Sequence, residues 1–163
     1  MKNKQEIPNR RSIRLKEFDY TTPNAYFITI VTKDRECFLG TIENEEALLS
    51  EEGKIVLDVW NRLPKHYPNV LLDAFIVMPN HIHGILILIE PDDEKKKYPV
   101  SEIVRGLKSL SSRLINRKNN STGTSRWQRN YYEHIIRDEE ELHEKREYII
   151  FNANKWNEDS YFQ

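Results

Sequence analysis

The sequence predicts an α+β fold, a ferredoxin-like or RRM-like sandwich with a mainly antiparallel central sheet and helices packed on it. Two apolar, β-branched runs, residues 71–78 and 81–90, are separated only by Pro79 and Asn80. This spacing indicates two antiparallel strands joined by a tight turn. Around the pair, predicted elements follow one another in the order strand, helix, strand, strand, helix, strand, helix. That alternation indicates an α+β sandwich.

Length and composition fit a single soluble globular domain. The chain has 163 residues, of which 38% are apolar and 31% charged, enough for a buried core and a charged surface. Its one cysteine, Cys37, permits no internal disulfide, and no charged-then-apolar leader opens the sequence. No apolar run approaches the roughly 20 residues that span a bilayer. We therefore expect a cytoplasmic protein with no membrane segment.

The first half of the chain is expected to supply one strand and one helix. Residues 25–32 are aromatic and β-branched and form the first predicted strand, with a short extended segment at residues 37–42 beside it. Asn44 is a candidate N-cap for a helix that begins with Glu45 and Glu46, although Gly53 interrupts its pattern. From residue 54 onward, apolar positions recur at helical spacing until Pro64 and Pro68 end the helix.

The second half predicts two further helices around a last strand. Residues 91–99 form an acidic and lysine-rich loop, after which Ser101 and Glu102 open a helix with a buried apolar stripe and a basic exposed face. Residues 119–125 are a polar loop, and the aromatic and β-branched content of residues 127–137 indicates a strand. Asp138 is the expected N-cap of the final helix, which continues to residue 152.

His81 and His83 open the second strand of the pair. Residues two apart on a strand share one face, so both imidazoles should project together while Ile82 faces the other way. Two imidazoles on a rigid face can hold a divalent cation, and a hard ion such as Mg²⁺ or Mn²⁺ would need oxygen ligands from elsewhere in the chain. The alternative is that both are polar residues on a solvated face.

The net charge of −1 does not itself indicate a nucleic-acid partner, but the charges are segregated along the chain. Basic residues concentrate at residues 2–16 and 105–129, and acidic residues at 43–52, 92–94 and 138–144. Such segregation permits a basic face for a phosphate backbone. An ordinary solvated surface explains the same pattern equally well.

Several motifs together resemble the IS200-like single-tyrosine transposases, and within them the REP-associated tyrosine transposases that accompany repetitive extragenic palindromes. The resemblance spans about Arg10 to Trp156 and rests on five strings, which read Arg-Ser-Ile-Arg-Leu (11–15), Asn-Ala-Tyr-Phe (24–27), Met-Pro-Asn-His-Ile-His-Gly (78–84), Trp-Gln (127–128) and Tyr-Ile-Ile-Phe-Asn (148–152). The combination of these strings is specific evidence for the family, whereas the His-x-His pair alone is weak evidence.

The resemblance implies an HUH endonuclease, in which His81 and His83 bind a divalent metal, Mg²⁺ or Mn²⁺, beside the scissile phosphate. Tyr148 matches the nucleophile, and Asn152 matches the position of the third metal ligand, by analogy with a glutamine in related transposases. Tyr148 and Asn152 are four residues apart and therefore share one face of the last helix. The chain lacks the proline that commonly follows Asn152 in the family, so its helix can run on further.

The implied activity is cleavage and rejoining of single-stranded, hairpin-forming palindromic DNA through a 5′-phosphotyrosine, by a monomer or homodimer at the nucleoid. The domain is expected at residues 20–157, between a basic N-terminal arm at 1–19 and a C-terminal tail at 158–163. Candidate DNA-binding residues lie on the arm, the basic helix and the segment after it: Arg10, Arg11, Arg14, Arg105, Lys108, Arg113, Trp127 and Arg129.

Other assignments fit the sequence less well. Tyr131 and Tyr132 are rival nucleophiles, which we assign to the strand and to core packing or base stacking. His134 is expected to be a structural histidine. The sequence lacks a third histidine at position 85, a second His-x-Thr or His-x-Ser motif, and His-Glu-x-x-His, which argues against histidine-triad hydrolases, two-histidine phosphoesterases and metalloproteases. The functional alternative is a domesticated protein that binds DNA hairpins without cleaving them.

Overall fold

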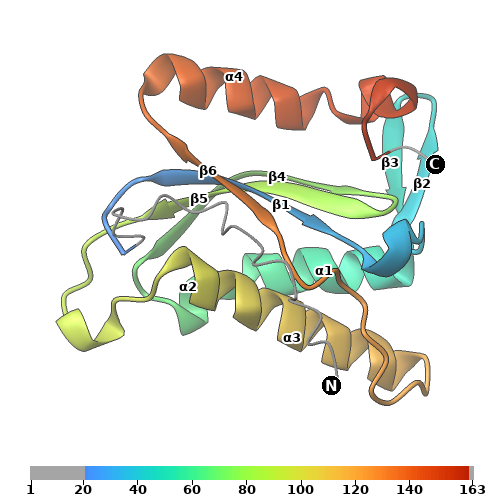
Figure 1. Ribbon diagram of the computed structural model, residues 1–163, viewed down its shortest axis with the longest axis horizontal. Coiled ribbons are helices and arrows are strands. Elements are labelled where there is room, and N and C mark those ends of the chain that lie inside the picture. Colours follow the sequence, from blue (N-terminus) through green and yellow to red (C-terminus); the bar gives the residue numbers. More distant parts are fainter. Residues whose placement is uncertain (1–20, 162–163) are drawn as a thin grey trace, which may run out of the picture.

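A computed structural model of the protein describes residues 21–161 and confirms the predicted fold class (Figure 1). Four strands form one antiparallel sheet in the order β4-β5-β1-β6. They are β1 (Ala25–Val31), β4 (Val70–Met78), β5 (His81–Leu88) and β6 (Tyr132–Ile136). The two-residue turn of Pro79 and Asn80 joins β4 to β5 as the sequence predicts. Strand β5 lies in the middle of the sheet and is almost wholly buried.

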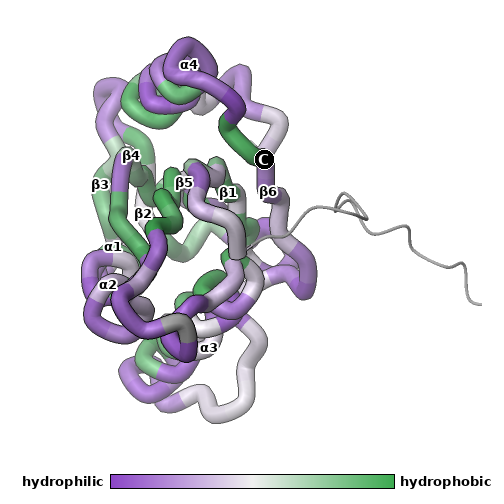
Figure 2. Tube along the Cα trace, turned by 90° about the vertical axis from the view of Figure 1, so that its left-hand side faces the viewer, coloured by the Kyte–Doolittle hydropathy of each residue, from purple (hydrophilic) through white to green (hydrophobic). Residues whose placement is uncertain are grey.

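Helices cover both faces of this sheet, which explains why β5 reads as a continuous apolar run. Helices α1 (Glu51–Asn61), α2 (Leu63–His66) and α3 (Val100–Lys118) lie on one face, and α4 (Glu139–Ile150) lies on the other (Figure 1). Short 3₁₀ turns complete the chain: η1 (Lys33–Arg35), η2 (Glu94–Lys96) and η3 (Ala153–Glu158). Figure 2 shows the apolar sheet strands enclosed by more hydrophilic helices.

Alternate residues of the strands divide the core into two parts. On the side of α1 and α3, residues such as Ile28, Ile82 and Trp60 form the larger cluster. On the side of α4, a smaller cluster contains Phe27, Ile85, Ile136, Leu142 and Ile149. His81 and His83 belong to the same face of β5 as Ile85, so the helix above them is α4.

The predicted helix start at Asn44 is wrong. Asn44 and Glu45 both have positive φ angles, 49° and 66°, as in the two-residue turns that join hairpin strands. They connect β2 (Gly40–Glu43) to β3 (Glu46–Leu49), a separate two-stranded sheet. Helix α1 begins instead after Ser50, whose Oγ accepts a hydrogen bond from the Gly53 backbone at 3.0 Å. The N-cap of α1 is therefore Ser50, whereas the sequence pattern favoured Asn44.

Other boundaries differ by smaller amounts. Helix α1 ends at Asn61, and Pro64 lies in the first turn of the short helix α2 instead of ending α1. The last strand is shorter than residues 127–137, because only Tyr132–Ile136 pair regularly with β1. Asp138 is confirmed as the cap of α4, where its Oδ1 accepts from the Glu141 backbone at 2.8 Å. Helix α4 ends at Ile150, two residues before the predicted end at Asn152, and the chain continues from Ala153 as the 3₁₀ turn η3.

Residues 1–19, the predicted basic arm, lie outside the described part of the chain. The tail predicted at residues 158–163 is described as far as Tyr161. No helix within residues 21–161 is long and apolar enough to cross a bilayer.

Candidate functional site

The two histidines of β5 lie buried under α4. His81 and His83 are 0% and 1% exposed, and their ring centroids are 4.6 Å apart. Ile82 points into the opposite cluster, as the strand periodicity predicts. The alternative of two polar residues on a solvated face is therefore wrong, because neither ring reaches solvent.

Each histidine is oriented through its Nδ1 atom. Asn80 Oδ1 lies 2.8 Å from His81 Nδ1, while the Asn80 amide donates to two backbone carbonyls. Thr29 lies directly across the sheet from His83, with its Oγ1 2.7 Å from His83 Nδ1. A proton held on each Nδ1 leaves the Nε2 lone pair free to bind a metal. Both Nε2 atoms are buried without a hydrogen-bond partner in the described structure.

The environment keeps both rings neutral near pH 7. Burial lowers the pKa of His81 to about 4, although Asp159 and Asn152 oppose that shift. Burial, followed by the repulsion of His81 and Lys145, lowers the pKa of His83 well below its usual range. Neutral imidazole is the form that coordinates metals, so both side chains are in the protonation state that a metal site requires.

Helix α4 and the residues just after it supply two further side chains to the same site. The Tyr148 ring lies 5.1 Å from the His83 ring and 5.9 Å from Phe27, and it is 45% exposed. Asn152, one turn later, is 3% exposed, and its Oδ1 is buried without a hydrogen-bond partner. Burial and Asp159 raise the pKa of the Tyr148 phenol, while Asn152 partly offsets them. The phenol is therefore protonated at neutral pH.

Asp159 belongs to the site but was missed by the sequence analysis. Ligand atoms of His81, His83 and Asp159 all lie within 4.8 Å of one another. The Asp159 side chain is 3% exposed, and Oδ2 is 3.7 Å from His81 Nε2. No basic side chain other than His81 forms an ion pair with it within residues 21–161. Its position seven residues after Asn152, in a polar tail, carries no periodic or motif signal.

The chain end packs against the histidines. The Tyr161 ring lies 4.6 Å from His81, and the Tyr161 carbonyl accepts from Asn80 Nδ2 at 2.7 Å. Arg35 donates to the Ser160 carbonyl at 3.3 Å and lies 5.8 Å from the Tyr161 ring. The Asn80 side chain therefore fixes both the His81 tautomer and the segment that carries Asp159.

Two side-chain interactions tie α4 to the sheet and so position Tyr148. Arg146 donates to both carboxylate oxygens of Asp73, at 2.8 and 2.6 Å. Asp73 lies at an irregularity of β4, where the register with β5 shifts between Leu72 and Phe75. On the other side, His134 of β6 pairs with Glu141 of α4. His134 is thus a structural histidine, as expected from the sequence.

Comparison with known proteins identifies the family. The sequence profile described as "Transposase IS200 like" matches residues 24–152, most of the chain. The chain belongs to the IS200-like transposase family. A protein of Haemophilus influenzae (strain ATCC 51907 / DSM 11121 / KW20 / Rd), described only as uncharacterized, is 38% identical over 96% of this chain and 94% of its own length. A second protein of that strain, provisionally described as a REP-associated tyrosine transposase, is 28% identical over 84% of this chain and 74% of its own length.

Solved structures support the fold assignment. A REP-associated tyrosine transposase bound to a REP hairpin superposes with a TM-score of 0.64, at 20% identity, over 88% of this chain and 74% of that one. A protein of Deinococcus radiodurans R1, provisionally described as a transposase, gives a TM-score of 0.52 at 18% identity over 86% and 96% of the two chains. At these identities the superpositions show that this IS200-like transposase shares their fold.

The candidate DNA-binding residues that lie within residues 21–161 are on the face of the sheet opposite the histidines. Arg10, Arg11 and Arg14 lie outside the described residues. Arg105, Arg113 and Arg129 are exposed, on or beside α3, across the sheet from α4. Lys108 donates to the carbonyls of Gln128 and Arg129 at 2.7 and 2.9 Å. Trp127 is 3% exposed, and its Nε1 donates to Ser111 Oγ at 2.9 Å.

The rival tyrosines occupy different environments in the family fold. Tyr131 packs against the larger core cluster, and its hydroxyl donates to Glu133 at 2.7 Å. Tyr132 is 43% exposed, and its ring lies 6.4 Å from Phe27 on the side of the histidines. Tyr132 is therefore the proper control tyrosine for any test of Tyr148.

Proposed function

We propose that the protein is a metal-dependent endonuclease and strand transferase that cleaves single-stranded, hairpin-forming palindromic DNA through a 5′-phosphotyrosine on Tyr148. One observation carries the proposal. His81 Nε2, His83 Nε2 and Asn152 Oδ1 are buried without hydrogen-bond partners within residues 21–161, and the His83 ring lies 5.1 Å from the Tyr148 ring. Leaving a polar atom buried and unpaired costs about 1–3 kcal/mol, so three such atoms in one place are best explained by a ligand that satisfies them.

The donor set suits a divalent cation. Two imidazole nitrogens, one amide oxygen and the Asp159 carboxylate make a mixed nitrogen and oxygen site, for which we propose Mg²⁺ or Mn²⁺. A bound cation also balances the charge of Asp159, a buried carboxylate whose neighbouring histidines are neutral. When bound, the metal would polarise the scissile phosphate and favour ionisation of a nearby phenol.

The exposure and packing of Tyr148 support its proposed role as the nucleophile. It is nearly half exposed, so DNA can reach its hydroxyl, while its ring packs against Phe27 and His83 and holds the side chain in place. The tyrosyl oxygen would form a bond to phosphorus as the bond to the 3′ oxygen breaks, and the proton lost by the phenol would be balanced by the proton that the leaving 3′ oxygen gains. The products are a 5′-phosphotyrosine and a free 3′-hydroxyl, and the reverse step rejoins the strand.

The proposed partner is hairpin DNA. Support comes from the family assignment and from the structural neighbour described as bound to a REP hairpin. The exposed arginines of α3 and the residues after it would contact phosphates. We predict that the protein acts as a monomer or homodimer and associates with the nucleoid.

A non-catalytic hairpin binder is the second candidate, because the fold could be retained without the chemistry. The test is incubation of wild type, Tyr148→Phe and Tyr132→Phe with a hairpin oligonucleotide from the flanks of the gene, in Mn²⁺. We expect a covalent protein-DNA adduct in wild type and Tyr132→Phe, and none in Tyr148→Phe or His83→Ala. Hairpin binding without an adduct in any protein would favour the binder.

A further inference from the structure

The face of α4 that carries Tyr148 also carries a lysine. Glu141, Lys145, Tyr148 and Asn152 follow one another at intervals of four, three and four residues, which is the spacing of one helix face. Glu141 pairs with His134 of β6, and Asn152, just after the helix, is buried among the proposed metal ligands. No step of the proposed cleavage uses Lys145.

The Lys145 ammonium lies against the same aromatic ring as the proposed nucleophile. Its Nζ is 5.2 Å from the centroid of the Phe27 ring. The His83 ring stacks on Phe27 at 5.4 Å, and the Tyr148 ring meets Phe27 edge-on at 5.9 Å. After burial and the repulsion of His81, the positive charge of Lys145 also lowers the pKa of His83. Lys145, His83 and Tyr148 therefore surround one side chain.

Lys145 is not matched with an acid. It is partly buried, and its Nζ forms neither an ion pair nor a hydrogen bond within residues 21–161. The next residue, Arg146, pairs with Asp73. A lysine ammonium carries three donors, and contact with an aromatic face uses none of them in a hydrogen bond. Lys145 therefore keeps its donors for an anion that enters the site.

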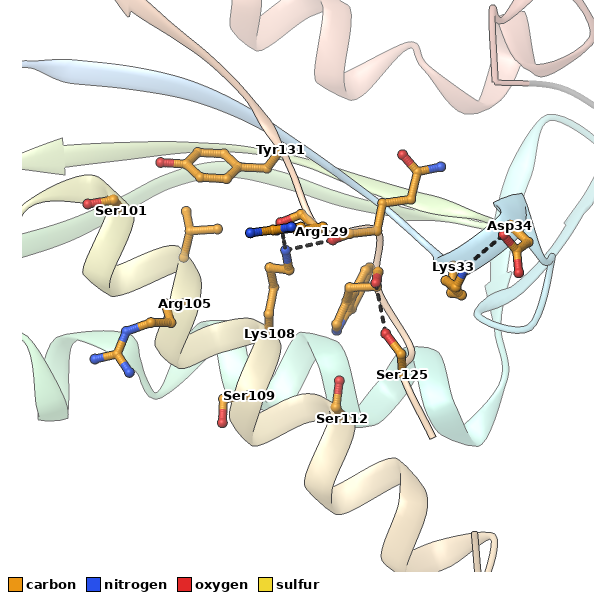
Figure 3. A pocket seen from close by; sticks show the side chains of 13 residues that line it. Lys33, Asp34, Ser101, Arg105, Lys108, Ser109, Ser112, Ser125, Arg129 and Tyr131 are labelled. Carbon is orange, nitrogen blue, oxygen red and sulfur yellow. Dashed lines mark hydrogen bonds and ion pairs between the residues drawn. The ribbon is translucent and has the colours of Figure 1, made fainter. Parts of the chain in front are cut away.

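The other charged surfaces do not supply this cation. A pocket of about 410 Å³ beside Tyr148 is acidic, and Lys145 is not among its lining residues. The charged residues that line this pocket are four acids and one lysine, namely Glu144, Glu147, Glu158, Asp159 and Lys155. Arg105, Lys108 and Arg129 line a different pocket, between α3 and residues 125–131 (Figure 3). That pocket is across the sheet from α4 (Figure 1), too far for contact with a phosphate at the Tyr148 hydroxyl.

We propose that Lys145 binds a non-bridging oxygen of the scissile phosphate and stabilises the negative charge that this group gains in the transition state. The inference rests on the proposed function, because it assigns a further catalytic residue to that reaction. Lys145 keeps its proton throughout. The Tyr148 oxygen bonds to phosphorus as the bond to the 3′ oxygen breaks, and the proton lost by the phenol balances the one that the 3′ oxygen gains.

Single-turnover rates of adduct formation test this role in Mn²⁺, with a hairpin oligonucleotide from the flanks of the gene. We expect Lys145→Met, which keeps the apolar stem over Phe27, to react about 100-fold more slowly than wild type. Its affinities for the hairpin and for Mn²⁺ should change by about threefold or less. Lys145→Arg keeps the charge and should retain more of the rate. The matched control is Lys155→Met, which removes the exposed lysine of the acidic pocket and should react like wild type. Equal losses in Lys145→Met and Lys155→Met, or a wild-type rate in Lys145→Met, would overturn the inference.

A neutral linkage at the cleaved position distinguishes contact with the phosphate from a structural role of Lys145. A methylphosphonate replaces one non-bridging oxygen with a methyl group, in either of two stereoisomers. If Lys145 contacts the replaced oxygen, that stereoisomer slows wild type, and Lys145→Met shows no further loss on it. A further loss of about 100-fold in Lys145→Met on both stereoisomers would contradict the contact.

Lysine acetylation separates this inference from the fate of the proposed function. Tyr148→Phe is treated with an amine-acetylating reagent, with and without the hairpin and Mn²⁺, and the acetylated lysines are identified by mass spectrometry. Protection of Lys145, while the exposed Lys155 and Lys65 stay reactive, supports a phosphate contact even if wild type never forms an adduct. If Lys145 stays fully reactive with the hairpin bound, the inference is overturned and the cleavage proposal is left intact.

Discussion

Thr29 of β1 and His83 of β5 are cross-strand partners, and their side chains meet at 2.7 Å between Oγ1 and Nδ1. If His83 binds a metal through Nε2, its Nδ1 carries the proton, and Nδ1–H donates a hydrogen bond to Thr29 Oγ1. The sheet register thus sets the orientation of a buried histidine ring. Asn80, the neighbour of His81 in the β4–β5 turn, orients the His81 ring in the same way.

Thr29→Val removes the hydroxyl and keeps the shape of the side chain. We expect the affinity for Mn²⁺ to fall about 10- to 100-fold, because the His83 ring loses the partner that fixes its orientation. Isothermal titration calorimetry measures the change, with Thr41→Val on the exposed hairpin strand β2 as the control. An unchanged affinity in Thr29→Val would show that the hydroxyl does not support a metal ligand.

We propose Asn152 and Asp159 as the oxygen ligands of the metal. We expect Asn152→Ala and Asp159→Ala each to weaken Mn²⁺ binding by roughly tenfold or more, because each removes an oxygen from the site. Glu158→Ala is a matched control, since Glu158 is an exposed acid next to Asp159. If Glu158→Ala weakened binding as much as Asp159→Ala, general negative charge and not ligation would explain the effect.

The Asp73–Arg146 pair predicts a pH-dependent stability. The hydrogen bonds from Arg146 hold the pKa of Asp73 below its ordinary value near 3.8. The pair therefore stabilises the fold above that ordinary value, and the stabilisation is lost as pH falls through the lower pKa of the folded state. We expect Asp73→Asn to lower the free energy of unfolding by about 1 kcal/mol at pH 7, a value limited by the partial exposure of Arg146.

Denaturant unfolding of wild type and Asp73→Asn at several pH values provides the measurement. The difference between them should shrink as pH falls below about 4. Asp58→Asn, which breaks the exposed pair with Arg62 on α1, should show a smaller effect at every pH. A difference for Asp73→Asn that stays constant down to the acid transition would contradict this account.

Gly84 leaves room for Trp60 beneath the histidine strand. A Cβ atom on Gly84 would lie 2.5 Å from Trp60 Cη2, and the Trp60 ring is itself stacked on Phe75 at 4.2 Å. We expect Gly84→Ala to cost about 1–3 kcal/mol in unfolding free energy, measured in urea. The cost should be smaller in a Trp60→Phe background, because phenylalanine lacks the colliding atom. An equal cost in both backgrounds would show that the contact is not the cause.

The sequence predicted the parts of the fold that depend on periodicity. Local spacing predicted the β4–β5 pair and the opposite faces of Ile82 and the two histidines. Capping chemistry predicted Asp138 as the cap of α4. The Asn44 turn was misread because asparagine suits both helix caps and positive-φ turns, and the choice depended on the tertiary position of Ser50.

The candidate site was predictable only in part. Strand periodicity placed the two histidines together, and helical spacing joined Tyr148 to Asn152. Local patterns give no signal for contacts between segments that are distant in sequence. Such contacts bring Asp159 and Thr29 to the histidines and pair Asp73 with Arg146.

The most direct test of the central claim is to identify the residue that carries DNA after reaction with a hairpin oligonucleotide in Mn²⁺. The adduct is digested with protease and nuclease, and the modified peptide is sequenced by mass spectrometry. We predict a 5′-phosphodeoxynucleotide on Tyr148, absent from Tyr148→Phe although that variant still binds the hairpin. A nucleotide on Tyr132 or Tyr161, or an adduct that persists in Tyr148→Phe, would contradict the account.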